Sequence, residues 1–244
     1  MGRVKIAKKS TFIDMTAMSD VTVLLLTFFM LTSTFLQKEP TTVITPPSVS
    51  EEKVQETNYV QVLLSPEGKI WLTMNNDTSS VWSNDNMRKA VLDKVAEIYN
   101  ETHKSNPISF TPQQKEAFSK IATFGVPLRQ MGEFLDLATL PNGEGQTQMD
   151  KWLEGEDTNP NHQTGIPISW NSNPENPTEF QMWIKAMRQT ENDNLAQAIK
   201  DGSGIAIKAD ENTSFDIVHM VMDNLQTIKQ NKFTFLTALK AGGE

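Results

Sequence analysis

Cysteine is absent from this chain of 244 residues, and histidine occurs only three times. The absence of cysteine excludes disulfides, thiol nucleophiles and thiolate metal ligands. The histidines, His103, His162 and His219, are too scattered for a metal cluster or a catalytic triad. No other nucleophile–base spacing stands out. We therefore expect a protein that is not an enzyme and that binds no metal and no other cofactor.

Basic residues are also fewer than acidic residues in this chain. The chain carries 22 Lys and Arg against 30 Asp and Glu, which gives a net charge of −8. Arg3, Lys5, Lys8 and Lys9 fall within the first nine residues, so the remainder of the chain is more acidic still. Nucleic acid is bound through a basic face, and we therefore exclude it as a partner.

One long apolar run is present near the N-terminus. No charged residue occurs between Val21 and Phe35. Together with its flanks, this run can form a helix with close to the roughly 20 residues that a membrane span needs. We predict a single transmembrane helix over 13–36.

The flanks of this run set its orientation. Basic residues are concentrated before it, which places 1–12 in the cytoplasm and the rest of the chain beyond the membrane. A cleaved signal peptide is the alternative. The length of the run, the lack of an A-x-A cleavage site and the presence of Asp20 favour a retained anchor instead.

The segment over 37–57 has the composition of a linker on the far side of the membrane, which is the periplasm if the resemblance described below holds. It contains Pro40, Pro46 and Pro47 among threonines, serines and charged residues, without a periodic apolar face. Such a composition favours extended or disordered chain, which either lets the domain move or is a passive spacer. The remaining residues, 58–244, are enough for one sizeable core or two small ones.

Hydrophobic periodicity and turn residues predict an α+β fold for this exported region. A helix is expected to begin after Thr111, which can form a capping box with Gln114 and is followed by Pro112 at the first helical position. Trp152, Trp170 and Trp183 are expected in a core. The predicted elements are a hairpin at Tyr59–Met74, helices at Ser83–Asn100, Thr111–Thr123 and Leu128–Leu140, an irregular stretch at Pro141–Pro177 with a short strand at Ile166–Trp170, a helix at Thr178–Lys200, a strand at Gly204–Ala209, a helix at Ser214–Lys229 and a strand at Lys232–Leu239.

Two segments far apart in the sequence carry recognisable motifs. Ile13–Val21 (IDMTAMSDV) precedes a leucine-rich run, and Ile205–Leu225 (IAIKADENTSFDIVHMVMDNL) combines a strand ending in K-A-D with a helix containing V-M-D-x-L. Both segments resemble the ExbD/TolR family of biopolymer transport proteins. Ala17 stands where the family has proline.

The resemblance also implies a division of the exported domain. Two stretches, about 58–102 and 203–240, correspond to the compact family core. Between them lies an insert over about 103–202, which has no counterpart in that core. The resemblance says nothing about the role of this insert.

The resemblance further implies a function. ExbD-like proteins work as a pair of helices inside a pentameric ring of a multi-span ExbB/TolQ-like partner. Protons pass the helix aspartate, which matches Asp20, and the motion reaches a TonB-like or TolA-like periplasmic protein. Asp210 and Asp223 match the family's periplasmic motif. We therefore expect an inner-membrane, energy-transducing motor subunit in which protons are the coupling ion.

The residues themselves also favour a proton site at Asp20. On a helix, Thr16, Thr27 and Thr34 fall within about 40° of Asp20, which makes one polar stripe along an apolar cylinder. A poorly solvated carboxyl group has its pKa raised toward the operating range. Hydroxyls on the same stripe can hold water or donate to the carboxylate.

Simpler roles stay open for the same residues. Asp20 could sit at headgroup level or cap its helix, and each threonine could bond back to a helix carbonyl. Asp14 is a candidate for a helix cap or for proton entry. Asp157, Asn159 and Asn161 have the spacing of a calcium loop, but His162 replaces its glycine, which argues against calcium.

Other functions compete with the motor. The chain could be a TolR-like subunit for envelope integrity, or a membrane-tethered anchor that binds peptidoglycan through its acidic, loop-rich insert. A tethered periplasmic hydrolase is the least supported alternative, because no nucleophile–base pair is evident.

Overall fold

The structure is a computed structural model, and it divides into two compact units, Met1–Lys38 and Glu39–Glu244. Each unit is described by itself. The residues that the structure describes are 15–32, 39–48, 57–75, 84–140, 143–190 and 194–239.

The first unit contains one helix, α1, which spans Met15–Thr32. Its apolar side chains are all exposed where they are described, from 53% for Leu25 to 87% for Leu31. No helix within the described residues meets the length and hydropathy expected of a membrane span. The predicted span over 13–36 therefore stays a prediction.

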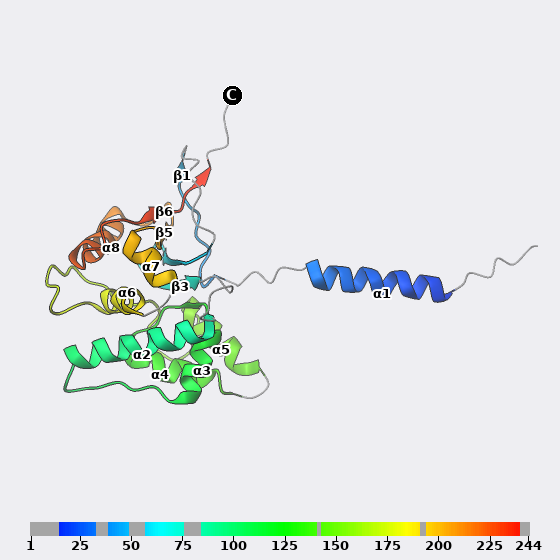
Figure 1. Ribbon diagram of the computed structural model, residues 1–244, viewed down its shortest axis with the longest axis horizontal. Coiled ribbons are helices and arrows are strands. Elements are labelled where there is room, and N and C mark those ends of the chain that lie inside the picture. Colours follow the sequence, from blue (N-terminus) through cyan, green and yellow to red (C-terminus); the bar gives the residue numbers. More distant parts are fainter. Residues whose placement is uncertain are drawn as a thin grey trace, which may run out of the picture. The chain divides into compact units, whose positions relative to one another are not determined.

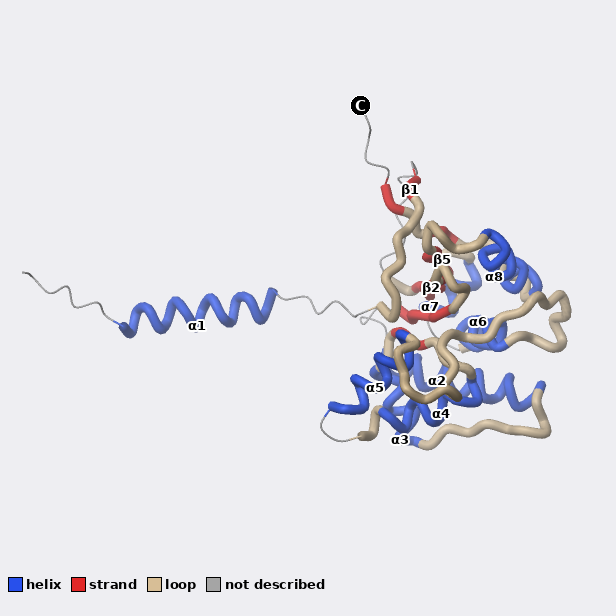
Figure 2. The backbone as a smooth tube through the Cα atoms, turned by 180° about the vertical axis from the view of Figure 1, so that it is seen from behind, coloured by secondary structure: helices blue, strands red, loops and turns tan. Residues whose placement is uncertain are grey.

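The second unit mixes helices and strands, which confirms the expected α+β class (Figure 1). Helices α2 to α5 lie together in the lower part of this unit in Figures 1 and 2, and β5, β6 and α8 lie above them. The elements are β1 (Pro47–Ser48), β2 (Tyr59–Leu64), β3 (Ile70–Asn75), α2 (Asn84–Thr102), α3 (Pro112–Lys120), β4 (Thr123–Phe124), α4 (Leu128–Leu137), α5 (Glu144–Glu154), α6 (Glu179–Gln189), α7 (Asn194–Asp201), β5 (Ile205–Ala209), α8 (Phe215–Thr227), β6 (Thr234–Phe235) and β7 (Ala238–Leu239).

A five-stranded sheet in the order β4-β3-β2-β5-β6 organises this unit. The predicted hairpin is confirmed: β2 and β3 pair antiparallel, with Tyr59 opposite Asn75 and Leu64 opposite Ile70. Its turn contains Gly68 at φ +83°, a conformation that glycine adopts without a steric penalty. Strand β5 pairs parallel with β2, and β6 pairs parallel with β5. Segments that are distant in the sequence therefore form the centre of the sheet.

Side-chain caps fix where two helices begin. Thr111 accepts a hydrogen bond from the Gln114 backbone N–H while the Gln114 side chain bonds the Thr111 backbone, so the predicted capping box of α3 is confirmed. Thr178 and Gln181 form the same box at α6, which the sequence reading did not mark.

Three of the predicted elements differ from the structure. The stretch over 141–177 contains a helix, α5, and its 166–170 segment is not a strand. The predicted helix over 178–200 is two helices, because Thr190 adopts extended backbone and ends α6. The predicted last strand is two short strands in different sheets, since β6 joins β5 while β7 pairs with β1.

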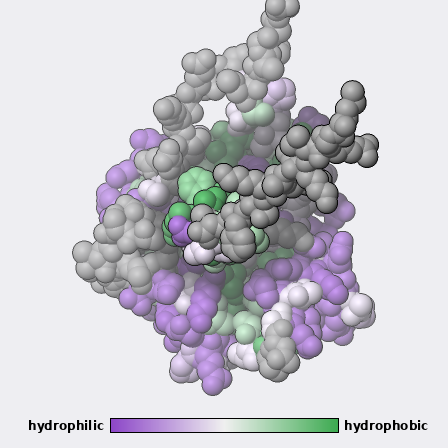
Figure 3. Space-filling model, turned by 90° about the vertical axis from the view of Figure 1, so that its right-hand side faces the viewer, coloured by the Kyte–Doolittle hydropathy of each residue, from purple (hydrophilic) through white to green (hydrophobic). Residues whose placement is uncertain are grey.

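The predicted insert shares one core with the rest of the unit. Strand β4 pairs with β3 at the edge of the sheet, so the insert extends the sheet directly. Trp152 and Trp183 are fully buried, as expected, whereas Trp170 is 53% exposed and its expected core position is wrong. Gly125 follows β4, and a Cβ there would lie 2.3 Å from Cδ1 of Trp71. Hydrophilic residues form much of the described surface in Figure 3, as expected where apolar side chains are buried.

Candidate functional site

Asp20 lies in the second turn of α1 and is exposed. It is the only charged residue between Met15 and Thr32. A carboxylate on an otherwise apolar helix is stable only where water, a hydrogen-bond donor or an opposite charge reaches it. The local sequence therefore creates one chemically distinct point on an apolar cylinder.

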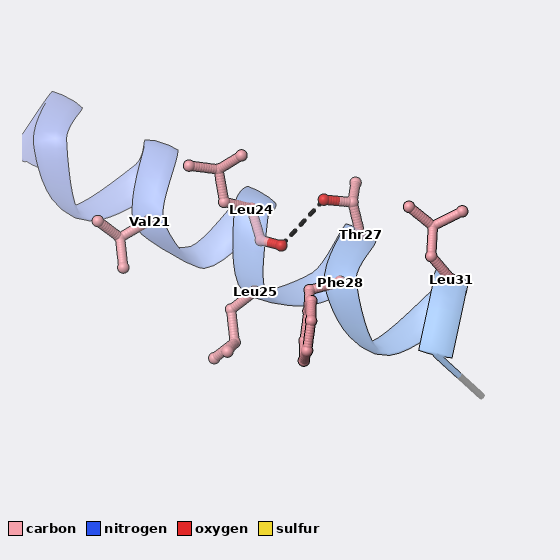
Figure 4. A pocket seen from close by; sticks show the side chains of 6 residues that line it. All are labelled: Val21, Leu24, Leu25, Thr27, Phe28 and Leu31. Carbon is pink, nitrogen blue, oxygen red and sulfur yellow. Dashed lines mark hydrogen bonds between the residues drawn. The ribbon is translucent and has the colours of Figure 1, made fainter.

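The hydroxyl groups of α1 bond to its own backbone. Thr27 donates to the carbonyl of Leu24 at 2.9 Å, and Thr22 donates to Met18 at 2.8 Å. Figure 4 shows the Thr27 bond on the face lined by Val21, Leu24, Leu25, Thr27, Phe28 and Leu31. With its proton used in this way, Thr27 can offer only lone pairs to water or to another donor.

The other members of the predicted stripe are described in part. Thr16 lies on α1 and is exposed, four residues before Asp20. Asp14 and Thr34 lie outside the described residues. The structure therefore places Asp20, Thr16 and Thr27 on one helix, and their roles stay predictions.

Asp210 of the predicted periplasmic motif follows β5 and is buried, with 6% exposure. Its Oδ2 accepts from the Ile44 backbone N–H at 2.8 Å, and its Oδ1 accepts from the Asn212 backbone N–H at 2.9 Å. These backbone hydrogen bonds, first from Asn212 and then from Ile44, hold the pKa of the Asp210 carboxyl below its ordinary value. The residue is thus an anionic acceptor that ties two chain segments together.

The segment attached by Asp210 belongs to the predicted linker. Residues 39–48 begin the second unit and lie against its later residues: Glu211 N–H donates to the Ile44 carbonyl at 2.8 Å, and Lys208 pairs with Glu39 at 2.6 Å. Strand β1 then pairs with β7. We call residues 39–48 the strap. The sequence predicts extended or disordered chain here, and in the strap backbone hydrogen bonds and the buried Asp210 carboxylate offset the entropy lost when the chain is held in one conformation.

Asp223, the second motif residue, lies half-buried on α8, where its backbone carbonyl accepts from Thr227 at 2.9 Å. Its neighbour Asn224 makes the longer-range contacts. The Asn224 amide donates to the Ser169 carbonyl at 2.9 Å, and its Oδ1 accepts from Thr178 at 2.9 Å. Asn224 therefore joins α8 to the start of α6 and to the loop before it, and sequence reasoning missed this role.

A second polar cluster surrounds His162 in the predicted insert. Its Nδ1 bonds the Asp157 carboxylate, its Nε2 lies 3.1 Å from Glu133 of α4, and its ring stacks on Trp152 with centroids 3.5 Å apart. The Asn159 amide lies 2.8 Å from the same Nε2. The carboxylates at both ring nitrogens favour the imidazolium form, whereas an N–H from Asn159 toward Nε2 favours the neutral ring.

The pKa of His162 reflects these contacts. Burial opposes the charged form, but hydrogen bonds to Asp157 and Glu133 raise the pKa of the imidazole above its ordinary value overall. The hydrogen bond from His162 lowers the pKa of Asp157. Asp157 is therefore an ion-pair partner of His162. Within the described residues, no group of three or more His, Cys, Asp or Glu is arranged to hold a metal ion.

The fold and the site define a class of protein: a mixed α/β domain preceded by an apolar helix that carries a single carboxylate. The family model described as "Biopolymer transport protein ExbD/TolR" matches residues 7–122, from before α1 to the start of β4. Residues 7–122 are therefore similar to the ExbD/TolR family, and the resemblance inferred from the first motif is confirmed over this segment. No curated protein and no solved structure matches the chain.

The family match sets the function at a coarse level. ExbD/TolR proteins are transport-associated rather than enzymatic, serve an energy-transducing role in biopolymer transport, and are generally anchored in the inner membrane. They generally work with ExbB/TolQ and TonB/TolA partners. The match includes Asp20 and ends before Ile205–Leu225, so the assignment of that second segment and the bounds of the insert stay predictions.

Proposed function

We propose that this chain is the proton-coupling subunit of an inner-membrane motor that drives outer-membrane transport. The helix over 13–36 spans the membrane with 1–12 in the cytoplasm, and the second unit lies in the periplasm. Two copies of the helix sit within a pentamer of an ExbB/TolQ-like protein. The periplasmic unit acts on a TonB-like or TolA-like protein.

The observation that carries this proposal is the position of Asp20 within the family-matched, apolar α1. Every described side chain of α1 is exposed, so the helix has no protein interior of its own. A carboxylate in a membrane costs on the order of 2.5–3.5 kcal/mol at a helix centre, so such groups face a protein interior or a water path. Partner helices would supply that interior.

The coupling follows from elementary electrostatics. A neutral carboxylic acid tolerates an apolar contact, whereas a carboxylate requires water or donors. Gain and loss of a proton at Asp20 therefore change which neighbouring surface the helix prefers. With Thr27 bonded to Leu24, its remaining lone pairs can accept from water on the same helix face, two turns from the carboxyl group. A proton flow through Asp20 would in this way be converted into movement of α1 against its ring.

Replacement of the carboxyl group tests the proposal. The variant Asp20→Asn should assemble with the ring partner and lose proton-driven uptake, because an amide cannot carry the proton. Asp20→Glu should retain part of the activity, and Thr22→Val, which removes a hydroxyl outside the stripe, should retain nearly all of it. Co-purification measures assembly, and uptake in cells measures coupling. Full uptake by Asp20→Asn would refute the proposal.

Two related functions are separated by further measurements. A TolR-like role in envelope integrity predicts that loss of the chain causes sensitivity to detergent while nutrient uptake remains. An anchoring role for the acidic, loop-rich insert predicts that the full chain sediments with purified peptidoglycan sacculi. We place transport first because the matching family model is described as a biopolymer transport protein, and the presence of Asp20 within the match favours a motor over a passive anchor.

A further inference from the structure

An exposed aromatic cluster lies on the second unit, outside the residues that match the family. Phe215 begins α8 and is 74% exposed, and Trp170, in the loop before α6, is 53% exposed. His219, also exposed, lies between them: its ring centroid is 5.8 Å from Phe215, nearly parallel, and 5.3 Å from Trp170, edge to face. We call these three residues the aromatic triad.

The triad is held in place by hydrogen bonds on both sides of Trp170. Asn224 of α8 donates to the carbonyl of Ser169 at 2.9 Å, and Thr227 donates to the carbonyl of Asn171 at 3.0 Å. The Asn171 amide in turn donates to the Gln181 side chain at 3.0 Å. A large aromatic side chain with a fixed backbone loses little entropy when it binds a partner.

The two segments that carry the triad contain only acidic charges of their own, although Lys185 and Arg188 of α6 donate to the carbonyls of Pro174 and Ile228 within them. The two segments that carry it, 163–178 and 209–228, contain no Lys or Arg and contain five carboxylates, those of Glu175, Asp210, Glu211, Asp216 and Asp223. Asp210 is buried by the strap, and the other four are exposed or half-buried. Asp216 and Asp223 lie seven residues apart on α8, close to the stripe of Phe215 and His219.

We propose that the aromatic triad binds an arginine-rich, extended segment of a partner protein. A guanidinium can stack on the exposed faces of Trp170 and Phe215 and bond the nearby carboxylates through its planar fork. An acidic or purely apolar partner would leave these carboxylates unpaired or repelled. The charge of the surface therefore selects a basic segment.

Binding of an arginine peptide to the full-length chain tests the inference. The probe is a fluorescein-labelled ten-residue peptide of alternating arginine and serine, and its affinity for the chain in detergent micelles is followed by fluorescence anisotropy. The double variant Trp170→Ala/Phe215→Ala should bind about tenfold or more weakly, since each cation–π contact at an exposed site contributes about two- to fivefold. Asp216→Asn/Asp223→Asn should reduce the salt dependence of binding.

Matched controls keep the result interpretable. Phe235→Ala removes another exposed aromatic ring, on β6, and should bind as the unchanged chain does. A glutamate–serine peptide should not bind. Circular dichroism and thermal unfolding confirm that the triad variants are folded, as expected for side chains that are largely exposed.

Several outcomes would overturn the inference. Equal affinity of the triad variants for the arginine peptide would do so, as would equal binding of the glutamate peptide. Triad-dependent binding of a soluble cell-wall glycan, or triad-dependent self-association in sedimentation, without arginine-peptide binding, would assign the surface to another occupant. Asp20→Asn should leave peptide binding unchanged, so the inference stands or falls separately from the motor proposal.

Discussion

Helices α1 and α6 are both rich in apolar side chains, and their surroundings are opposite. In α6 the apolar residues Phe180, Met182, Trp183, Ile184 and Met187 are all fully buried. In α1 every described side chain is exposed. Apolar surface left in water is unfavourable in proportion to its area. The difference teaches that the apolar side chains of α6 are buried by other residues of the same unit, whereas those of α1 need contacts from outside their unit. We propose that lipid and partner helices supply these contacts.

The largest expected effect is a loss of stability when a buried side chain of α6 is removed. Trp183 is fully buried and its ring lies 4.5 Å from that of Phe124, between centroids. Trp183→Ala should lower the free energy of unfolding by about 3–5 kcal/mol, because it removes a large buried ring and leaves a cavity. Chemical denaturation of the full chain, followed by circular dichroism, measures the change.

The matched control is Leu25→Ala on α1, which should change unfolding of the second unit by less than about 0.5 kcal/mol. Trp183→Phe adds a finer control, since the buried Nε1 of Trp183 has no hydrogen-bond partner among the described residues. Phenylalanine removes that unpaired donor along with part of the ring. A loss for Leu25→Ala as large as for Trp183→Ala would contradict the contrast between the two helices.

Sequence reasoning predicted the elements with strong local signals. The capping box of Thr111 and Gln114, with Pro112, correctly predicted the start of α3. The turn at Gly68 correctly predicted the hairpin. Helix α5 was missed because its buried residues, Met149, Trp152 and Leu153, lie in a stretch dominated by Gly, Asn and Pro. Long-range pairings such as β2 with β5 were not predicted, since periodicity carries no information about neighbours in a sheet.

The next effect concerns the strap, and it tests whether Asp210 holds these first residues of the second unit in place. Asp210→Ala removes both carboxylate oxygens, so the Ile44 N–H loses its acceptor. Amide exchange of Ile44 should accelerate on the order of tenfold, because a hydrogen bond to a charged acceptor is lost. Hydrogen–deuterium exchange of the full chain measures this. Exchange in β2 should stay unchanged, and equal protection of Ile44 in both proteins would show that Asp210 does not hold the strap.

The smallest effect concerns the loop attached to α4 and α5 by His162. The folded-state pKa of His162 is raised, so its stabilising contribution is fully present below its unfolded pKa and is lost as pH rises through the folded value. The pKa of Asp157 is lowered, so its contribution is present above its unfolded pKa and is lost as pH falls through the folded one. The loop should therefore be most protected between these two pKa values.

Hydrogen–deuterium exchange of residues 155–165 across this pH range measures the effect, after correction for intrinsic exchange rates. His162→Gln keeps a polar side chain but cannot be charged, so its protection should not fall as pH rises through the folded pKa of His162. Parallel profiles for the two proteins would argue against a charged His162.

In the candidate site, Asp20 could be predicted from the sequence, but the contacts of Asp210 and His162 could not. Asp20 stood out because a single charge interrupts an apolar run, and its neighbours in any ring lie on other chains that one sequence cannot describe. The contacts of Asp210 and His162 were not predictable, because they join residues 166 positions and 29 positions apart, Ile44 with Asp210 and Glu133 with His162. Only folding brings such partners together.

The strap has a mechanical consequence. Tension that enters the second unit from its N-terminal side meets the exposed Glu39–Lys208 pair first, then the Ile44–Asp210 bond, and then the short β1–β7 ladder. These attachments act in series along the chain, so they would yield one after another and lengthen the tether before strand β2 is pulled directly.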